Sequence, residues 1–365
     1  MIVAPPAVTS SILLERPTSI RRHLPLASNL GWMLPEFVVG PENQTLRYLF
    51  GEPTIALLER LSPIVLYGET NVGKTALSIT LAVTWARLTN HRPLCFTTGQ
   101  SFVRDYSAAV EIDDLDSFRK RHRQCQLLLI DDLESLASAP ASQSELVATL
   151  DAMEEQQRPV ILTANRLPST IGGLSSALTS RLSGGFSQAL LKPTAATLQV
   201  LVPAIIHVVD AKLAVEPLLE LCLKFTSKTL SAPDLTKLVT IAAQNRTANG
   251  AVDMHVVGLL AHQLFTGEGP TLAGIAKVVA RKMQVRLVEM RGATRQANIV
   301  RARGLAILLS RKLTSTSLQK IGEFFGGRDH STVIHACRKT EKLLDSDTEL
   351  ANLLQEVQAE LLRVG

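Results

Sequence analysis

One stretch of the chain combines glycines, a lysine and a threonine at a spacing that suits phosphate chemistry. It reads Gly68-Glu-Thr-Asn-Val-Gly73-Lys74-Thr75 and stands between the apolar run 63–68 and the helical pattern ALSITLAVTWARL. Glycines in such a loop let backbone N–H groups converge on phosphate oxygens at the start of a helix. Lys74 is then expected to reach the β- and γ-phosphates, and the Thr75 hydroxyl to ligate Mg²⁺. The predicted nucleotide-binding residues are Gly68, Asn71, Gly73, Lys74, Thr75 and Ala76.

A pair of carboxylates follows a second apolar run. Asp131 and Asp132 come directly after LLLI in the stretch LLLIDDLESL, and ligands of an open α/β sheet collect at such carboxyl ends. Asp131 suits the Mg²⁺ shell, and Asp132 could orient or deprotonate the attacking water. Alone, an Asp pair more often marks a turn at a strand end. The phosphate-binding loop in the same chain favours the metal site.

Two further polar side chains are candidates for catalysis. Asn165 ends the apolar run 159–165 and could position the water or sense the γ-phosphate, although such an Asn is usually a turn residue. Arg181 lies in LSSALTSRLSGGF. A lone surface arginine is normally just solvated, whereas an arginine supplied in trans to a neighbour's nucleotide would stabilise transition-state charge. The catalytic candidates are therefore Asp132, Asn165 and Arg181.

The elements that must position these residues follow from the apolar pattern. Four short apolar runs, 63–68, 93–98, 126–131 and 159–165, alternate with helix-length segments. Such buried runs predict a parallel sheet covered by helices on both faces. From Thr194 onward helices dominate, and GEGP at 267–270 marks a second boundary. The predicted division is a tail or linker at 1–30, an α/β nucleotide domain at 31–193, a helical lid at 194–266 and a helix-turn-helix domain at 267–365.

A second group of chemically informative residues is basic. Lys277 to Lys342 contain fifteen Lys and Arg against four Asp and Glu, a local charge of +11 in a chain of net charge +5, so the remainder sums to −6. Such a block predicts a domain that meets a polyanion. It carries an apolar helical face at 317–325, a turn at 326–329 and a second helical pattern at 331–344. In a helix-turn-helix, the N-terminal residues of the second helix meet base edges. The alternative is a basic, solvated pair of helices.

The composition excludes several other classes of protein. Only 4% of the residues are aromatic, which argues against an RNA reader that stacks bases on rings. The four cysteines include no Cys-x-x-Cys pair, so neither a disulfide framework nor a zinc ribbon is expected. The longest uncharged apolar stretch, 193–209, contains two prolines and is too short to span a bilayer. No basic residue precedes the apolar N-terminus as in a secretory signal, so we expect a cytoplasmic protein.

The segment RARGLAILLSRKLTSTSLQKIGEFFGGRDHSTVIHACRK resembles the signature of the bacterial DnaA family of replication initiators. Upstream, FVVGPEN (37–43), the phosphate-binding loop, TTGQSFVRDY (97–106), LLLIDDLESL and TSRLSGGF follow in that family's order, so the resemblance covers about residues 36–345. It implies a three-layer α/β AAA+ P-loop domain with a parallel sheet, a small helical lid and an all-α helix-turn-helix DNA-binding domain. It also implies ATP or ADP with Mg²⁺ as ligands and slow, regulatory ATP hydrolysis.

The resemblance assigns roles to individual residues. Lys74, Thr75, Asp131 and Asp132 match the nucleotide and Mg²⁺ residues, Asn165 the first sensor and Arg181 the arginine finger. Arg295 matches a minor-groove arginine, Arg303 and Arg311 match contacts to the DNA backbone, and Asp329, His330, Ser331 and Thr332 match the base-reading group. The implied partners are double-stranded origin boxes, further copies of the chain assembled with ATP on DNA, and single-stranded DNA. Contact with a helicase stays open.

Departures from the family pattern leave two functions in competition. The first thirty residues are too few for the family's N-terminal domain, Pro233 stands where the lid's sensor arginine is expected, and Ala177 replaces a second arginine of the finger motif. The first hypothesis is an ATP-dependent initiator that binds origin boxes, oligomerises and opens the duplex. The alternative is a sequence-specific DNA-binding regulator with weakened or lost ATP switching. A helicase or transposase loader is a third candidate, but it conflicts with the dedicated helix-turn-helix.

Overall fold

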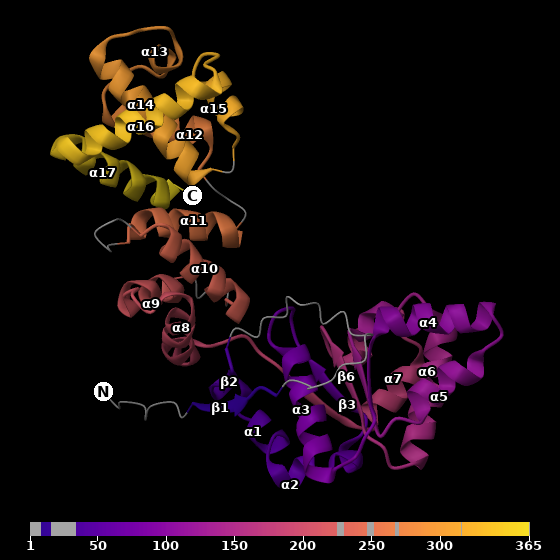
Figure 1. The fold of residues 1–365 in the computed structure, drawn as a ribbon. Helices are drawn as coiled ribbons and strands as arrows, with labels where there is room; N and C mark the ends of the chain where they lie inside the picture. Colours follow the sequence, from indigo (N-terminus) through magenta and orange to yellow (C-terminus); the bar gives the residue numbers. More distant parts are fainter. Residues whose placement is uncertain are drawn as a thin grey trace. The chain divides into compact units, whose positions relative to one another are not determined.

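The computed structural model describes residues 9–15, 34–224, 230–246, 252–266, 270–314 and 316–364. The chain forms two compact units (Figure 1). The N-terminal unit contains residues 1–208 and 222–235, and the C-terminal unit contains residues 209–221 and 236–365. Most of the boundary signal GEGP lies outside the described residues. Within the described residues, no helix combines the length and the apolarity needed to cross a membrane.

A five-stranded parallel sheet is the centre of the N-terminal unit, with the strand order β4-β5-β6-β3-β7. The strands are β3 (Ile64–Tyr67), β4 (Leu94–Thr98), β5 (Leu127–Asp131), β6 (Val160–Ala164) and β7 (Phe186–Ala189). The four apolar runs predicted as strands are confirmed as β3 to β6. The edge strand β7 was not predicted, because its sequence FSQA lacks the continuous apolar run that identified the others.

The sheet is covered on both faces, as the sequence predicted. Leu127 and Leu129 of β5 share an apolar core with α3 (Lys74–Thr89), α1 (Leu46–Leu49) and α2 (Glu52–Ile55). Leu128 and Ile130 of the same strand belong to a second core on the opposite face, because successive side chains of a strand alternate between faces. The helices of that second layer are α4 (Gly99–Glu111), α5 (Leu115–Arg123), α6 (Pro140–Glu155) and α7 (Ser176–Ser183). The three-layer α/β prediction is therefore confirmed.

The register of the sheet brings the carboxyl ends of its strands together. Tyr67, the last residue of β3, is level with Ala164 of β6 and with Ala189 of β7. Thr98 of β4 is likewise level with Asp131 of β5. The loops that follow these strands therefore start at one edge of the sheet, where the predicted phosphate-binding and metal-binding residues all lie.

Part of the segment expected as an N-terminal tail forms a strand. β1 (Ser10–Leu13) pairs antiparallel with β2 (Glu36–Val39). Ile12 and Leu14 pack against the apolar core around α3, and the Arg87 guanidinium of α3 lies 2.8 Å from the Glu15 carboxylate. Burial of apolar side chains thus gives residues 10–13 a defined place on the N-terminal unit.

After β7, every named element within the described part of the chain is a helix. The helices are α8 (Ala195–Asp210), α9 (Val215–Lys224), α10 (Ala232–Gln244), α11 (Met254–Thr266), α12 (Leu272–Lys282), α13 (Leu287–Arg291), α14 (Ala297–Leu313), α15 (Leu318–Phe324), α16 (His330–Ser346) and α17 (Thr348–Val364). One apolar core contains residues from all the helices α11 through α17, including Val256 and Leu259 of α11. The segment at 252–266, which the sequence assigned to the lid, thus shares a core with the helix-turn-helix elements.

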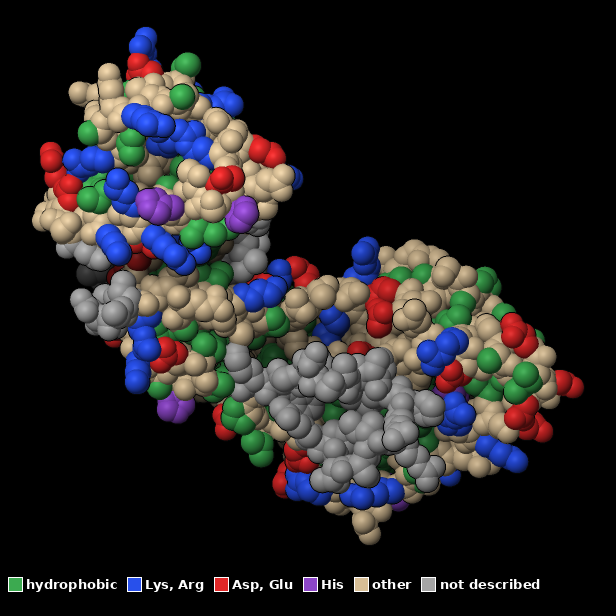
Figure 2. Space-filling model, turned by 45° about the horizontal axis from the view of Figure 1, so that its top comes forward, with side chains coloured by type: hydrophobic (Ala, Val, Ile, Leu, Met, Phe, Trp, Pro, Cys, Tyr) green, Lys and Arg blue, Asp and Glu red, His purple; other side chains and the backbone are tan. Residues whose placement is uncertain are grey.

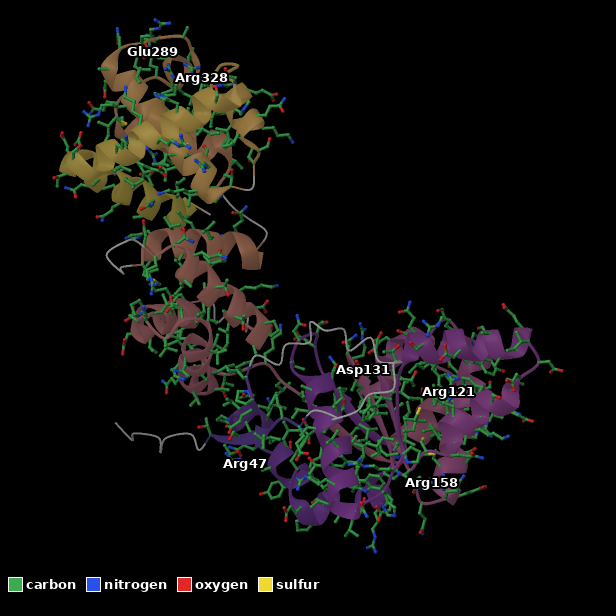
Figure 3. The ribbon with its side chains drawn as sticks, in the orientation of Figure 1. Arg47, Arg121, Asp131, Arg158, Glu289 and Arg328 are labelled. Carbon is green, nitrogen blue, oxygen red and sulfur yellow. The ribbon has the colours of Figure 1, made fainter. Side chains whose placement is uncertain are left out.

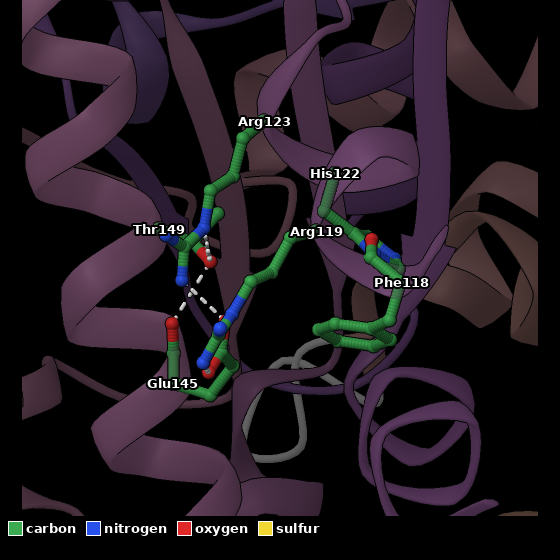
Figure 4. A network of polar contacts seen from close by, with 6 residues as sticks. All are labelled: Phe118, Arg119, His122, Arg123, Glu145 and Thr149. Atoms are coloured by element: carbon green, nitrogen blue, oxygen red, sulfur yellow. Dashed lines mark hydrogen bonds and ion pairs between the residues drawn. The ribbon is translucent and has the colours of Figure 1, made fainter. Parts of the chain in front are cut away.

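A buried carboxylate ties α5 to α6 in the second helical layer (Figure 4). The Glu145 side chain is only 5% exposed and accepts two hydrogen bonds from Arg119, at 3.1 Å each, and a third, short one from Arg123. Burial raises the pKa of Glu145, but the hydrogen bonds and charges of the two arginines outweigh burial and hold the pKa below its ordinary value. Phe118 and His122 of the same helix are buried, with their ring centroids 4.3 Å apart.

Glu145→Ala is expected to lower the free energy of unfolding by about 2 kcal/mol, because it removes the buried carboxylate that two partly exposed arginines share. The measurement is denaturant unfolding, with the exposed Glu155→Ala on the same helix as the control. Since the folded-state pKa of Glu145 is lowered, its contribution is full above about pH 4.3 and is lost as the pH falls through the folded-state pKa. Equal stability of the two variants at pH 7 would contradict this role.

Candidate functional site

The predicted phosphate-binding loop connects β3 to α3, as its sequence requires. Gly68 and Gly73 have φ angles of 156° and 98°, and Asn71 has a φ of 67°. A Cβ atom at Gly68 would lie 2.2 Å from the Leu190 carbonyl oxygen, so only glycine fits at this point. α3 begins at Lys74, which places Ala76 in its first turn. The loop thus delivers a helix N-terminus to the strand ends, an arrangement that binds phosphates.

The Lys74 ammonium group points back into this loop. Its Nζ donates to the carbonyl oxygens of Gly68 at 2.7 Å and Glu69 at 2.8 Å, and to Asn165 Oδ1 at 3.1 Å. Burial lowers the pKa of Lys74, and the charges of Glu134, Asp131 and Asp132 act in the opposite direction. Lys74 therefore already donates all three of its N–H bonds to protein oxygens. To bind a phosphate, it would have to exchange one or more of these oxygens for phosphate oxygens.

Thr75 and Asp131 meet at the end of β5, as predicted for a Mg²⁺ site. Asp131 is labelled in Figure 3. The Thr75 hydroxyl lies 3.0 Å from both carboxylate oxygens of Asp131. The buried Thr163 of β6 donates its hydroxyl to Asp131 Oδ1 at 2.5 Å and accepts the Asp132 N–H at 3.0 Å. Thr163 was missed at the sequence level, although it is the one polar residue in the strand segment VILTA.

Hydroxyl and carboxylate oxygens fit Mg²⁺, which usually takes one or two carboxylates together with substrate phosphates. Thr75 and Asp131 would hold the ion, and bound Mg²⁺ would neutralise phosphate charge. In the part of the chain that the structure describes, no group of three or more His, Cys, Asp or Glu side chains forms a separate metal cage.

The two remaining catalytic candidates near the loop also converge there. Asp132 is exposed, has a φ of 64° and accepts a hydrogen bond from the Ser135 hydroxyl at 2.6 Å. Asn165 uses its side-chain oxygen for Lys74 and its backbone N–H for a short hydrogen bond to Glu134. Glu134 was not singled out in the sequence, because an acidic residue after an Asp pair has no distinctive spacing.

Arg181 lies on α7 and forms ion pairs with α6. Its guanidinium is 2.8 Å from the Asp151 carboxylate and 3.9 Å from the Glu154 carboxylate, and half of its side chain is exposed. Among the described residues, these two acids are the ionic partners of Arg181, and neither belongs to the phosphate-binding loop. A role toward a neighbouring subunit's nucleotide stays a prediction.

The segment FVVGPEN forms hydrogen bonds with the connection between β7 and α8. The Asn43 side chain donates to the Leu191 carbonyl and accepts the Leu191 N–H, both at 2.9 Å. Glu42 accepts hydrogen bonds from the hydroxyls of Thr194 and Thr197. Lys192 of the same connection lies 2.6 Å from the carboxylate of Glu69 in the phosphate-binding loop. This connection is therefore tied directly to the nucleotide site, which the sequence pattern did not predict.

The C-terminal unit contains the predicted helix-turn-helix. α15 and α16 are joined by Gly326 and Gly327, whose φ angles are 97° and 67°. A Cβ atom at Gly322 in α15 would lie 1.9 Å from the Arg328 carbonyl oxygen. Ile321 and Phe325 are fully buried, as the apolar helical face predicted. The close approach of α15 to the turn therefore depends on glycine.

The N-terminal end of α16 presents polar side chains to solvent. His330, Ser331 and Thr332 are exposed, whereas Val333 and Cys337 are buried in the core. Asp329 caps the helix: its Oδ1 accepts the Thr332 N–H at 2.7 Å and the Ser331 hydroxyl at 2.9 Å. These bonds lower the pKa of Asp329 to about 2. Asp329, predicted to read bases, thus already organises the end of the helix.

The structure corrects the prediction for Arg303. Its side chain is buried and donates hydrogen bonds to the carbonyl oxygens of Met290, Glu289, Gly292 and Thr294, at 2.6 to 3.0 Å. A guanidinium held inside the protein by four carbonyls cannot also contact a DNA phosphate. Arg328 donates to the Phe325 and Gly292 carbonyls, and Arg291 to the Phe324 carbonyl. Figure 3 labels Glu289 and Arg328 in this region.

Other basic side chains of the block at 277–342 remain exposed. Predicted DNA contacts Arg295 and Arg311 are exposed. The basic side chains Lys312, Lys320, Arg338, Lys339 and Lys342 are exposed as well. Figure 2 shows Lys, Arg and His side chains grouped on the face of the C-terminal unit that it presents. These exposed residues contribute to the positive surface, whereas the buried Arg303 does not.

Fold and site together define the class of this protein: an α/β P-loop nucleotide domain combined with a helix-turn-helix unit. The model of the bacterial DnaA ATPase domain matches residues 29–189, and the model of the bacterial DnaA helix-turn-helix matches residues 272–340. The chain belongs to the bacterial DnaA family.

Individual relatives agree with this membership. The chromosomal replication initiator proteins DnaA of Francisella tularensis subsp. novicida and Francisella philomiragia are each 27% identical to the chain over 321 residues, which is 88% of the chain. The chain spans 65% of the length of these relatives. In fold it is similar to domain III of Thermotoga maritima DnaA (TM-score 0.54, 22% identity, 63% of this chain and 94% of that one). AMPPCP-bound DnaA from Aquifex aeolicus is also similar (TM-score 0.52, 23% identity, 90% and 96%).

Thr163→Val is expected to weaken Mg²⁺-dependent ATP binding by about tenfold, because it removes a donor to the Asp131 carboxylate and the acceptor of the Asp132 N–H. The affinity for ATP in EDTA, without Mg²⁺, should change less than twofold. Fluorescence titrations with Mg²⁺ and with EDTA measure the two affinities. The control is Thr84→Val, a buried threonine of α3 outside the site. If Mg²⁺ increased the ATP affinity of Thr163→Val as much as that of the native protein, Thr163 would not orient Asp131.

Arg303→Ala is expected to lower the free energy of unfolding by more than about 2 kcal/mol, because four carbonyls lose a charged donor. The exposed Arg338→Ala on α16 is the matched control and should stay within about 0.5 kcal/mol of the native protein. Thermal and denaturant unfolding measure both variants. If Arg303→Ala lost no more unfolding free energy than Arg338→Ala, the structural role of Arg303 would be wrong.

Proposed function

We propose that this DnaA-family protein is an ATP-dependent replication initiator. In this proposal it binds short double-stranded origin boxes, assembles on them as an ATP-bound oligomer and promotes opening of the adjacent duplex. The observation that carries the proposal is the pairing, in one chain, of two formed sites. A phosphate-binding loop meets Thr75 and Asp131 at the sheet edge, and the signature GGRDHST forms the exposed start of a helix after a tight turn.

The nucleotide site supports binding of ATP or ADP with Mg²⁺. Lys74 would exchange its three present acceptors for phosphate oxygens, and Thr75 and Asp131 would hold Mg²⁺. Asp132 is exposed at the site and would orient or deprotonate the attacking water, with Asn165 facing the terminal phosphate. We infer slow, regulatory hydrolysis.

The helix-turn-helix supports sequence-specific recognition of duplex DNA. His330, Ser331 and Thr332 are free to face base edges in the major groove, because the buried side of α16 carries other residues. Arg311 would contact the phosphate backbone and Arg295 the minor groove. Both side chains are exposed. Single-stranded DNA, expected as a further partner, would be bound after opening of the duplex.

Assembly would depend on Arg181. Its guanidinium is half exposed and held by two carboxylates of α6, so it is anchored near the surface. In an oligomer it would stabilise charge on the nucleotide of the neighbouring subunit. This contact makes the assembly sensitive to the bound nucleotide.

A specific observation favours a second function, a DNA-binding regulator with weakened ATP switching. Pro233 is the second residue of α10, in a first turn closed by reciprocal hydrogen bonds between Ser231 and Asp234. A proline there offers no cation for a γ-phosphate. Lys237 stands one turn further along α10, and Lys228 lies outside the described residues.

Footprinting on the chromosomal origin of the source organism tests the proposal. The native protein should protect discrete boxes with either nucleotide, and ATP should extend the protection and open the duplex more than ADP does. Lys74→Ala and Arg181→Ala should protect single boxes normally but lose the extension. Permanganate reactivity of unpaired thymines measures the opening. Identical footprints and opening with ATP and ADP would instead support the regulator.

A further inference from the structure

A third carboxylate, Glu134, lies in the nucleotide site between the predicted acidic pair and the end of β6. Its Oε1 accepts a short hydrogen bond from the Asn165 N–H. Its Oε2 is buried and has no hydrogen-bond partner among the described residues. A carboxylate kept partly from water with one oxygen unsatisfied lowers stability. Its position therefore calls for a role other than stabilising the fold.

Glu134 accepts a hydrogen bond from the backbone at the point where the chain leaves β6. Asn165 is the first residue beyond that strand, and its N–H bonds to Glu134 rather than to a neighbouring strand. The Asn165 side chain then accepts the Lys74 ammonium at 3.1 Å. A chain of hydrogen bonds therefore runs from Glu134 through Asn165 to the phosphate-binding lysine, linking three segments of the site.

The charge of Glu134 also acts on this lysine. Among the three acids that oppose the lowering of the Lys74 pKa by burial, Glu134 has the largest effect. Burial raises the pKa of Glu134 itself, and Asp132 adds to that rise. Asp132 differs from Glu134 because it is exposed. Asp132 is therefore the better placed of the two to contact the attacking water.

We propose that Glu134 is a positioning residue of the nucleotide site, which holds Asn165 at the end of β6 so that its side chain meets Lys74 and faces the terminal phosphate. The inference deepens the proposed function and rests on it. It assigns Glu134 an effect on turnover that is exerted through Asn165 and not by contact with substrate. That distinction makes it testable.

The first experiment uses the nucleotide-free protein. Amide hydrogen exchange of the peptide that contains Asn165 should accelerate about tenfold in Glu134→Ala, because the N–H loses a charged acceptor. Glu134→Gln keeps an oxygen at the same reach and should preserve the slow exchange. Glu155→Ala, an exposed glutamate of the same unit, is the control. Unchanged exchange in Glu134→Ala would overturn the proposal.

The second experiment is a double-mutant cycle with Asn165→Ala, which keeps the backbone N–H but removes the side-chain contact to Lys74. Glu134→Ala should lower kcat about tenfold in the native background but less than about twofold in the Asn165→Ala background. Affinity for a fluorescent ATP analogue is measured alongside. Equal losses in both backgrounds would overturn the proposal, since Glu134 would then act independently of Asn165.

Two further variants keep the result unambiguous. Glu134→Asp retains the charge but shortens the side chain by one methylene, so it should behave like Glu134→Ala and replaces it if that variant does not fold. Lys74→Ala tests the proposed function separately. If Lys74→Ala bound the ATP analogue as well as the native protein, the proposed function would fail. If Lys74→Ala lost binding while Glu134→Ala matched Glu155→Ala, only the role of Glu134 would fail.

Discussion

The Asp131 carboxylate is the group on which the nucleotide site depends. It ends a strand that is buried on both faces, so its charge must be met by neighbouring donors. Thr75 supplies one hydroxyl and Thr163 the other. Because Thr163 also accepts the Asp132 N–H, the same contact fixes the turn that carries the second carboxylate. The phosphate-binding loop, β5 and β6 are thereby held in one arrangement.

In the C-terminal unit, positive charge has two separate uses. Arg303 and Arg328 turn inward and donate to backbone carbonyls, including that of Gly292. Arg301 pairs with Asp347, and Lys282 pairs with Glu356 of α17. Exposed side chains such as Arg338 and Lys339 of α16 are part of the surface available to a polyanion. A net charge counted along the sequence cannot separate these uses, because the loops that receive the buried arginines are defined only by folding.

The sequence was sufficient to predict β3 to β6, because a strand that is buried on both faces needs a continuous apolar run. The helix-length segments between these runs indicated that the strands pair in parallel. The sequence was not sufficient for β7 or β1. FSQA has no apolar run, and its edge position comes from pairing with β3. β1 forms because Ile12 finds an apolar core that residues distant in the sequence create. Both strands depend on partners far along the chain.

The site residues also divide into those with a local sequence pattern and those that depend on partners far along the chain. Spacing predicted Lys74 and Thr75, because a phosphate-binding loop has a local signature. Asp131 was predicted only because that loop is present in the same chain, since an Asp pair by itself more often marks a turn. The helix-turn-helix was equally readable, since glycines and an alternation of buried and exposed positions specify it. Only the tertiary structure revealed Thr163 and Glu134, and only it turned Arg303 inward. The roles of these residues are set by the register between strands and by carbonyls in distant loops, and such long-range pairings leave no periodic trace in the sequence.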